Sequence, residues 1–297
     1  MIHHLNRAAG LCLTAALLLT AAGCGQQTVP ESPSPSPVVE TAAADKNDLT
    51  VVRSMELQYA NNFAVDYCAN GCKIITDGAG QKFLWVPEGG EAPDDTGDMT
   101  VLQAPLTKLG CFSTTHATLF HAIGALDKVS LVTTDKDKWH IEQVAQQIED
   151  GTTTYVGKNS APDYELISAA APQIILISAN TMHGSDEVLA KLDELGIPYI
   201  ADSQHLENHP LGRVEWVKLV GALLDMEEEA DAYFDEEVQR VNAVAESVAG
   251  ESEHPTILQT YIFKGTVYVR NGGDYVNKML ELAGGCLLYT SPSRRDS

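Results

Sequence analysis

"ENHPLGRVEWVKLVGALL", residues 207–224, is the strongest structural signal in the chain. It begins with the Pro and Gly of a turn and continues as a helix that is apolar on most of its circumference. The apolar positions after Leu211 are Val214, Trp216, Val217, Leu219, Val220, Leu223 and Leu224. Such a helix is normally buried in a large core or held between two bodies. We therefore predict a buried interlobe helix over residues 206–225.

The segments on both sides of this helix have α/β patterns. Residues 49–88 alternate apolar and polar side chains between Asn-Gly and Asp-Gly turns, which predicts a β-meander. The next segment alternates strands with helices, which predicts βαβ units on a parallel sheet. Its predicted strands are 128–134, 153–157, 173–178 and 197–202, and its helices are 118–127, 140–151, 162–171 and 185–196. These elements form an N-terminal lobe over 49–205.

A second, smaller lobe is predicted over residues 226–285. It begins with a long amphipathic helix, which is followed by strand-like runs at 256–263 and 266–270 and a helix over 274–285. The fold class is therefore α/β, with two βαβ lobes joined by a long helix. The second lobe has fewer strands than the first, so we expect it to be incomplete, with uncovered apolar edges and weak ligand binding.

The first 48 residues indicate export. Arg7 precedes the apolar run "LCLTAALLL", which is too short to span a membrane as a mature helix. The following "TAAGC" resembles a bacterial lipobox, so residues 1–24 read as a lipoprotein signal peptide with Cys24 as the lipid anchor. Cleavage without lipidation is the alternative. Residues 25–48 are rich in Pro and Ser, which is typical of a disordered tether.

Charge and cysteine usage restrict the function further. The chain has 41 acidic against 19 basic residues, a formal net charge of −22. This surface repels nucleic acid, and it makes a lipid anchor necessary for binding to an anionic membrane. Cys68 and Cys72 flank a turn between two strand-like runs, where they form either a cross-strand disulfide or two free thiols. The cysteine spacing predicts no zinc site.

The last twelve residues differ from the rest of the chain. "CLLYTSPSRRDS", residues 286–297, has no helix or strand period and ends in basic residues. It resembles translated sequencing-adapter sequence, so we predict a non-native tail that cuts the second lobe short. An ordinary disordered terminus is the alternative.

Four ordered motifs between residues 49 and 285 resemble the solute-binding proteins of ABC importers for iron–siderophore complexes, haem and cobalamin. The motifs are "VGKNSAPDYELISAAAPQIILIS", "LDELGIPYI", "ENHPLGRVEWVKLVGALLDMEEEA" and "GGDYVNKMLELAGG". The resemblance implies the class III periplasmic-binding-protein fold, in which a rigid helix joins two lobes. It also implies an extracytoplasmic, monomeric, lipid-anchored protein that delivers its ligand to a permease and its ATPase. The ligand would be a ferric-siderophore complex, haem or cobalamin, and no cofactor is expected.

The resemblance and the strand-end rule together suggest site residues. "PDYELI" matches the family's first-lobe docking site, which makes Glu165 the expected permease contact. Ligand contacts are expected from loops that follow strands. These candidates are Thr115, His116, Trp139, His183, His209, Arg213, Tyr261 and Arg270. Arg213 is equally compatible with an ion pair, and Glu215 is expected to form one.

Two other functions are considered. A receptor for a bare transition-metal ion would use converging His residues among His116, His140, His183 and His209. A cell-surface metal-dependent hydrolase would need a clustered His/Asp site. The chain contains no G-x-S-x-G, H-E-x-x-H, P-loop or G-x-G-x-x-G motif, so we predict no catalytic residues, no enzyme and no bound metal.

Overall fold

The computed structural model describes residues 45–178, 185–270 and 273–288, all of which belong to the compact unit 43–297. Several predicted features lie outside these residues. They are the signal peptide with Cys24, the tether up to residue 44, the ligand candidate His183 and the tail after Leu288. No helix among the described residues is long and apolar enough to cross a membrane.

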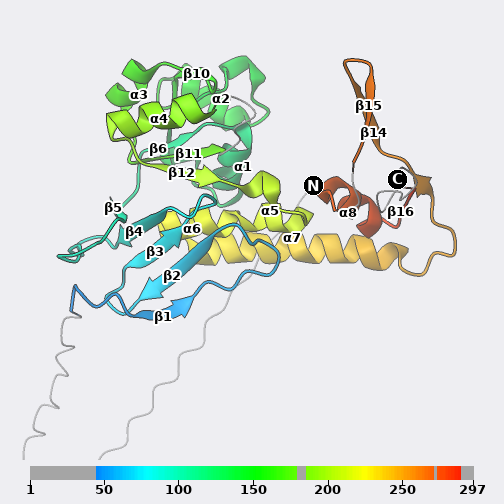
Figure 1. Ribbon diagram of the computed structural model, residues 1–297, viewed down its shortest axis with the longest axis horizontal. Coiled ribbons are helices and arrows are strands. Elements are labelled where there is room, and N and C mark those ends of the chain that lie inside the picture. Colours follow the sequence, from blue (N-terminus) through cyan, green and yellow to red (C-terminus); the bar gives the residue numbers. More distant parts are fainter. Residues whose placement is uncertain (1–44, 179–184, 271–272, 289–297) are drawn as a thin grey trace, which may run out of the picture. The chain divides into compact units, whose positions relative to one another are not determined.

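The first sheet confirms the predicted meander (Figure 1). It consists of β1 (Val51–Ser54), β2 (Ala64–Cys68), β3 (Lys73–Thr76), β4 (Lys82–Val86) and β5 (Thr100–Gln103), paired in that order. Strands β1 to β4 are antiparallel neighbours, and β5 adds to β4 in parallel. Strand β5, which follows the acidic loop after β4, was not predicted.

The second sheet is parallel throughout, as predicted. It consists of β6 (Leu109–Cys111), β7 (Val129–Val132), β8 (Thr154–Tyr155), β11 (Ile174–Ser178) and β12 (Tyr199–Asp202), in the order β12-β11-β6-β7-β8. The central strand β6 was not predicted. Gly110 in this strand is closely packed, because an added Cβ would lie 2.7 Å from Leu131 and 2.9 Å from Ile175.

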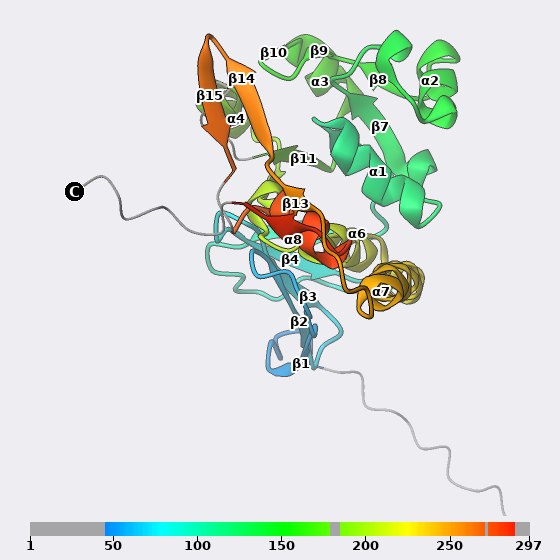
Figure 2. The same ribbon diagram turned by 90° about the vertical axis from the view of Figure 1, so that its right-hand side faces the viewer.

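Helices pack on both faces of the parallel sheet (Figures 1 and 2). They are α1 (Thr114–Ala122), α2 (Glu142–Glu149), α3 (Tyr164–Ala170) and α4 (Ser185–Leu195), with 3₁₀ turns at Leu126–Lys128, Lys136–Lys138 and Gln204–Leu206. Alternate residues of β11 point to opposite faces. Ile174 and Leu176 join the core beneath α1 and α2, and Ile175 and Ile177 join the core beneath α3 and α4. This two-sided burial explains why the strand is a continuous apolar run. The short strands β9 (Gly157–Lys158) and β10 (Ala161–Pro162) pair with each other before α3.

The predicted single helix over 206–225 is wrong. The segment forms α5 (Pro210–Glu215) and α6 (Val217–Leu224), which are separate helices on either side of Trp216. The long helix is the next one, α7 (Glu227–Val248). Gly221 lets α6 and α7 approach, because a Cβ there would lie 2.6 Å from Ala230.

The surroundings of α6 explain its apolar circumference. Its buried residues share one core with Val65 and Phe83 of the meander, Phe120 of α1 and Phe234 of α7. The indole of Trp85 also donates to the Leu223 carbonyl, at 2.9 Å. The helix is therefore covered by the meander, α1 and α7, and its apolar surface requires no second lobe.

The C-terminal segment departs from the predicted second sheet. It contains β13 (Thr256–Ile257), β14 (Thr260–Phe263), β15 (Thr266–Val269), α8 (Tyr275–Leu282) and β16 (Cys286–Leu287). Strands β14 and β15 form an antiparallel hairpin whose eight residues are all exposed. Strands β13 and β16 pair separately in parallel. The predicted helix is confirmed. The two predicted strand runs do pair with each other, through β14 and β15, but β13 at the start of the first run pairs with β16, so they form two separate two-stranded sheets and no larger one.

Strand β16 consists of the first two residues of the predicted tail. Cys286 and Leu287 pair with Thr256 and Ile257, and Leu287 is buried. The expectation that regular structure stops at residue 285 is therefore wrong for these two residues. That residues 286–297 are non-native remains a prediction.

Candidate functional site

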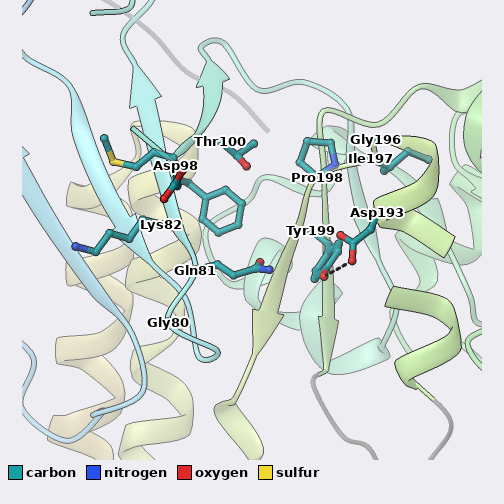
Figure 3. A pocket seen from close by; sticks show the side chains of 12 residues that line it. Gly80, Gln81, Lys82, Asp98, Thr100, Asp193, Gly196, Ile197, Pro198 and Tyr199 are labelled. Atoms are coloured by element: carbon teal, nitrogen blue, oxygen red, sulfur yellow. Dashed lines mark hydrogen bonds between the residues drawn. The ribbon is translucent and has the colours of Figure 1, made fainter. Parts of the chain in front are cut away.

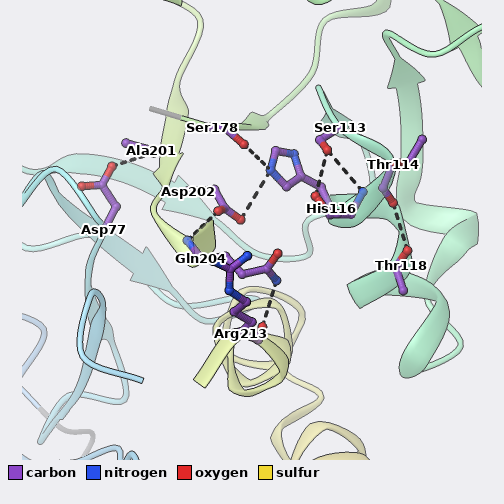
Figure 4. Close-up of polar contacts among 11 residues, drawn as sticks. Asp77, Ser113, Thr114, His116, Thr118, Ser178, Ala201, Asp202, Gln204 and Arg213 are labelled. Atoms are coloured by element: carbon purple, nitrogen blue, oxygen red, sulfur yellow. Dashed lines mark hydrogen bonds and ion pairs between the residues drawn. The ribbon is translucent and has the colours of Figure 1, made fainter. Parts of the chain in front are cut away.

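Polar side chains collect at the carboxyl edge of the parallel sheet (Figure 4). Ser113 follows β6, Ser178 ends β11 and Asp202 ends β12. The carboxyl ends of parallel strands are the usual binding edge of an open α/β sheet. We call Ser113, Thr114, Thr115, Ser178 and Arg213 the edge site.

The start of α1 contributes hydroxyl groups to the edge site. The Ser113 hydroxyl caps the helix by accepting from the Thr115 N–H, and it lies 2.8 Å from the Thr115 hydroxyl oxygen. Thr114 and Thr115 are exposed. The first turn of α1 has no acidic side chain, so the partial positive charge of the helix N-terminus remains available to an acceptor. The predicted ligand residue Thr115 thus lies at this edge.

His116 lies below the edge site and not on its surface. Its side chain is fully buried, with Nε2 3.4 Å from the Asp202 carboxylate and 3.4 Å from the Ser178 hydroxyl. Burial lowers the pKa of His116, although the Asp202 charge opposes this. The ligand contact predicted for His116 therefore stays a prediction, and the buried position of its side chain gives it a supporting role beneath the edge site.

The depressed pKa of His116 predicts how stability depends on pH. Below the ordinary value of 6.5, the unfolded state binds a proton that the folded state does not, so stability falls as the pH falls. The slope reaches at most about 1.4 kcal/mol per pH unit and levels off at the folded pKa. We expect this slope to become shallower in His116→Gln, measured by urea unfolding between pH 7.5 and 5, with the exposed His121→Gln as control. Equal slopes in all three proteins would contradict the assignment.

Arg213 is held at the edge site by backbone and ring contacts. Its guanidinium donates to the carbonyls of His205 and Glu207 and lies 3.4 Å from the ring centroid of Tyr275 in α8. Burial lowers the pKa of Arg213, and the nearby charge of Arg270 lowers it further. Two predicted ligand residues, Arg213 and Arg270, therefore both lie beside the start of α8. Arg270 also pairs with Asp274 at 2.7 Å.

The remaining ligand candidates have other contacts. The imidazole of His209 caps α5 by accepting from Leu211 N–H and stacks on Tyr59, with the centroids 4.4 Å apart. Trp139 is half-buried against the main core, which is the one that contains the buried residues of α6. Its indole donates to the Thr134 carbonyl. Tyr261 stacks on Tyr268 within the exposed hairpin, at 5.0 Å. These contacts give each side chain a structural role, and none of them places it at the edge site.

Two buried carboxylates shape the loop that packs against α5. Glu215 accepts hydrogen bonds from the backbone N–H groups of Gln58, Tyr59 and Ala60, each at 2.8 Å. Its expected ion pair is present, with Lys218 at 3.7 Å. Glu207 accepts from the N–H groups of Asn61 and Asn62 and from the Trp216 indole. The two side chains anchor residues 58–62 to the helix pair.

Glu165 and the cysteine pair lie apart from the edge site. Glu165 is exposed in the first turn of α3, where it is accessible to a partner. Cys68 and Cys72 face each other across the β2–β3 turn, and the Cys68 N–H donates to the Cys72 carbonyl. Both thiols are buried and free, so the structure contains no disulfide between them. Burial raises the pKa of both thiols.

Sequence reasoning missed several residues of this region: Ser178, Asp202, Glu207 and Tyr275. Ser178 and Asp202 are the last residues of predicted strands, so the strand-end rule contained the signal for both. Glu207 and Tyr275 are defined by contacts with residues distant in sequence, and no local pattern marks them. Among the described residues, no group of three or more His, Cys, Asp or Glu side chains is arranged to hold a metal ion.

The chain is similar to a known protein family and to two curated lipoproteins. The model of a family described as periplasmic binding protein matches residues 111–292, more than half of the chain. An uncharacterized lipoprotein of Methanocaldococcus jannaschii is 34% identical over 175 residues, which cover 55% of this chain and 41% of the relative. A second one from that organism is 23% identical over 209 residues, which cover 68% and 52%. The chain therefore spans about half the length of these curated relatives.

A solved structure supports the same fold. It is described as a possible iron-binding (periplasmic solute-binding) protein from Staphylococcus epidermidis. The TM-score is 0.51 at 17% identity, and the match covers 62% of this chain and 67% of that one.

Proposed function

The chain belongs to the periplasmic binding protein family, and on that premise we propose that it is the solute-binding lipoprotein of an ABC importer. It captures a ferric-siderophore-like ligand outside the cell and passes it to a membrane permease, without turnover. Haem and cobalamin are the other ligands of the proposed class. The solved relative described as a possible iron-binding protein supports an iron-containing ligand.

The observation that carries the proposal is the grouping of donors at the edge site. The hydroxyls of Ser113, Thr114 and Thr115 lie at the start of α1. Arg213 stacks on Tyr275 of α8, and Arg270 pairs with Asp274, the N-cap of the same helix. Guanidinium and hydroxyl groups donate hydrogen bonds to anionic oxygens. Ferric siderophores and the carboxylates of haem present such oxygens on a large surface.

The affinity of this chain is expected to be weak. Among the described residues, the edge site consists of one sheet edge with α8 beside it, whereas small-molecule sites usually enclose most of the ligand surface. We therefore expect a dissociation constant of ~10⁻⁶ M or weaker for the best ligand.

Calorimetric titration tests the proposal. The chain is titrated with a ferric hydroxamate siderophore, a ferric catecholate siderophore, haemin, cobalamin, Mn²⁺ and Zn²⁺. We expect one of the first four to bind more tightly than either free ion. Arg213→Gln and Arg270→Gln should each weaken that binding about tenfold or more, because a charge-assisted hydrogen bond is lost. Arg240→Gln is the control, since Arg240 pairs with Glu236 and Glu237 on the exposed side of α7.

Two outcomes of this titration would overturn the proposal. Tight binding of Mn²⁺ or Zn²⁺, with none of the organic ligands bound, would favour a receptor for a bare metal ion. Conversion of a bound ligand at a rate proportional to protein concentration would favour an enzyme.

Glu165 is the proposed contact with the permease. Glu165→Arg is expected to impair ligand uptake strongly in cells that depend on the importer, because charge complementarity orients docking. Ligand affinity should stay within about twofold, since a distant exposed charge is largely screened. Glu142→Arg, on the exposed start of α2, makes the same charge change elsewhere and should leave uptake unchanged. A large loss of ligand affinity in Glu165→Arg would instead place Glu165 in the binding site.

Cys24 is the proposed lipid anchor on the outer membrane face. The lipoprotein names of the curated relatives support this assignment. We expect labelled palmitate to enter the wild-type protein and the Cys286→Ala control, and to be absent from Cys24→Ala. Cys24→Ala should also be absent from the membrane fraction. Equal labelling of Cys24→Ala and wild type would contradict the anchor.

A further inference from the structure

A pocket of about 640 Å³ lies away from the edge site (Figure 3). Three segments line it: residues 80–83 of the β3–β4 hairpin, residues 98–100 at the start of β5, and the turn from α4 into β12 with Tyr199. Tyr199 begins β12 and Asp202 ends it. The pocket therefore lies at the amino end of that strand, opposite the end that contributes to the edge site. Its volume is in the range of small-molecule sites.

Two carboxylates are among the polar side chains that line this pocket. Asp98 belongs to the meander wall and Asp193 to the α4 wall, and Figure 3 shows them on opposite sides. The Tyr199 hydroxyl donates to one oxygen of Asp193 at 3.4 Å. Burial raises the pKa of Tyr199, so the phenol stays neutral and can keep this bond. The other Asp193 oxygen remains available to a ligand.

The pocket also has apolar surface and little positive charge. Ile197 and Pro198 line the α4 wall beside Asp193. Lys82 is the cationic side chain among the lining residues, and Figure 3 shows its ammonium directed away from Gln81 and Tyr199. The surroundings add to the negative potential, because the chain has a formal net charge of −22.

We propose that this pocket binds an aliphatic organic cation with two or more amino groups. Two carboxylates on opposite walls match a ligand with positive charge at both ends, and the apolar surface of Ile197 and Pro198 suits a methylene chain. Lys and Arg side chains of a partner protein share part of this chemistry. The concave, small-molecule-sized shape favours a free polyamine over a protein surface. The proposal is independent of the ligand at the edge site.

Calorimetric titration of the full chain with spermidine, at about 150 mM salt to screen exposed charges, tests this site. We expect saturable binding of one spermidine. Asp193→Asn and Asp98→Asn should each weaken it by about tenfold or more, because each removes a charge-assisted hydrogen bond. Glu251→Gln is the matched control: it removes the same charge from an exposed position and should leave the affinity unchanged.

The variants separate a specific site from diffuse attraction to an acidic protein. Equal binding by all four proteins, or binding that does not saturate, would overturn the proposal. A lysine-containing peptide that binds more tightly than spermidine and loses affinity in Asp193→Asn would also overturn it, in favour of a docking surface. Both Asp positions are exposed, so the variants should unfold at the same urea concentration as wild type.

Discussion

Replacing Glu215 by Ala is expected to lower the free energy of unfolding by about 3–6 kcal/mol, because three backbone donors, one of them buried and two part-buried, lose their acceptor. Gln58, Tyr59 and Ala60 each donate to this fully buried carboxylate at 2.8 Å. Lys218, itself largely buried, loses a partner at 3.7 Å and keeps Asp231 at 3.1 Å. Since domains are typically stable by about 5–15 kcal/mol, this variant should be partly unfolded or close to it.

Urea unfolding followed by circular dichroism measures the effect. Glu215→Gln keeps one oxygen acceptor at the same position, so its loss should be smaller than that of Glu215→Ala. Glu251→Ala removes an exposed carboxylate and should change stability by less than about 0.5 kcal/mol. If Glu215→Ala is within about 1 kcal/mol of wild type, the three hydrogen bonds do not anchor the loop as described.

Trp216→Ala is expected to cost about 3–5 kcal/mol, as large-to-small changes of buried aromatic residues do. Trp216 is fully buried between α5 and α6, and its ring centroid lies 4.9 Å from the ring centroid of Phe63. Its indole also donates to the Glu207 carboxylate at 3.2 Å. The substitution therefore leaves a cavity and removes one donor from a buried anion.

Two further variants separate these contributions in the same urea experiment. Trp216→Phe keeps most of the ring volume and removes the N–H, so it should cost less than Trp216→Ala. Trp139→Ala removes a half-buried ring at the margin of the main core and should also cost less. A Trp139→Ala loss equal to or larger than the Trp216→Ala loss would contradict the central position of Trp216.

Local patterns were sufficient where a segment is long and periodic. The meander, the strands β7, β11 and β12 and the helices α3 and α4 follow from alternation, apolar runs and turn residues. Strand β6 was missed although it is central in the sheet. It has three residues, one of them Gly110, and so carries no measurable period. Its position is decided by β11 and β7, which pair with it on both sides.

Burial distinguishes neighbouring residues of the candidate site. His116 and Thr115 are adjacent in sequence, yet the first is fully buried and the second is exposed. The sequence cannot distinguish them, because the difference arises from Asp202 and Ser178, which approach His116 from strands β12 and β11. Arg213 and Arg270 were both proposed, but their proximity depends on how α5 meets α8.

The sequence by itself determined the alternation of strands and helices, the family motifs and the strand ends at which the edge site forms. Each of these depends on a repeat of two or 3.6 residues, or on turn residues close together in the chain. Tertiary structure alone decided that α6 is enclosed by the meander, α1 and α7, and that Glu207 and Glu215 anchor the loop at residues 58–62. Those outcomes depend on contacts between residues about 150 positions apart. A buried carboxylate is stable only where the fold supplies its hydrogen-bond donors, and no local pattern specifies that supply.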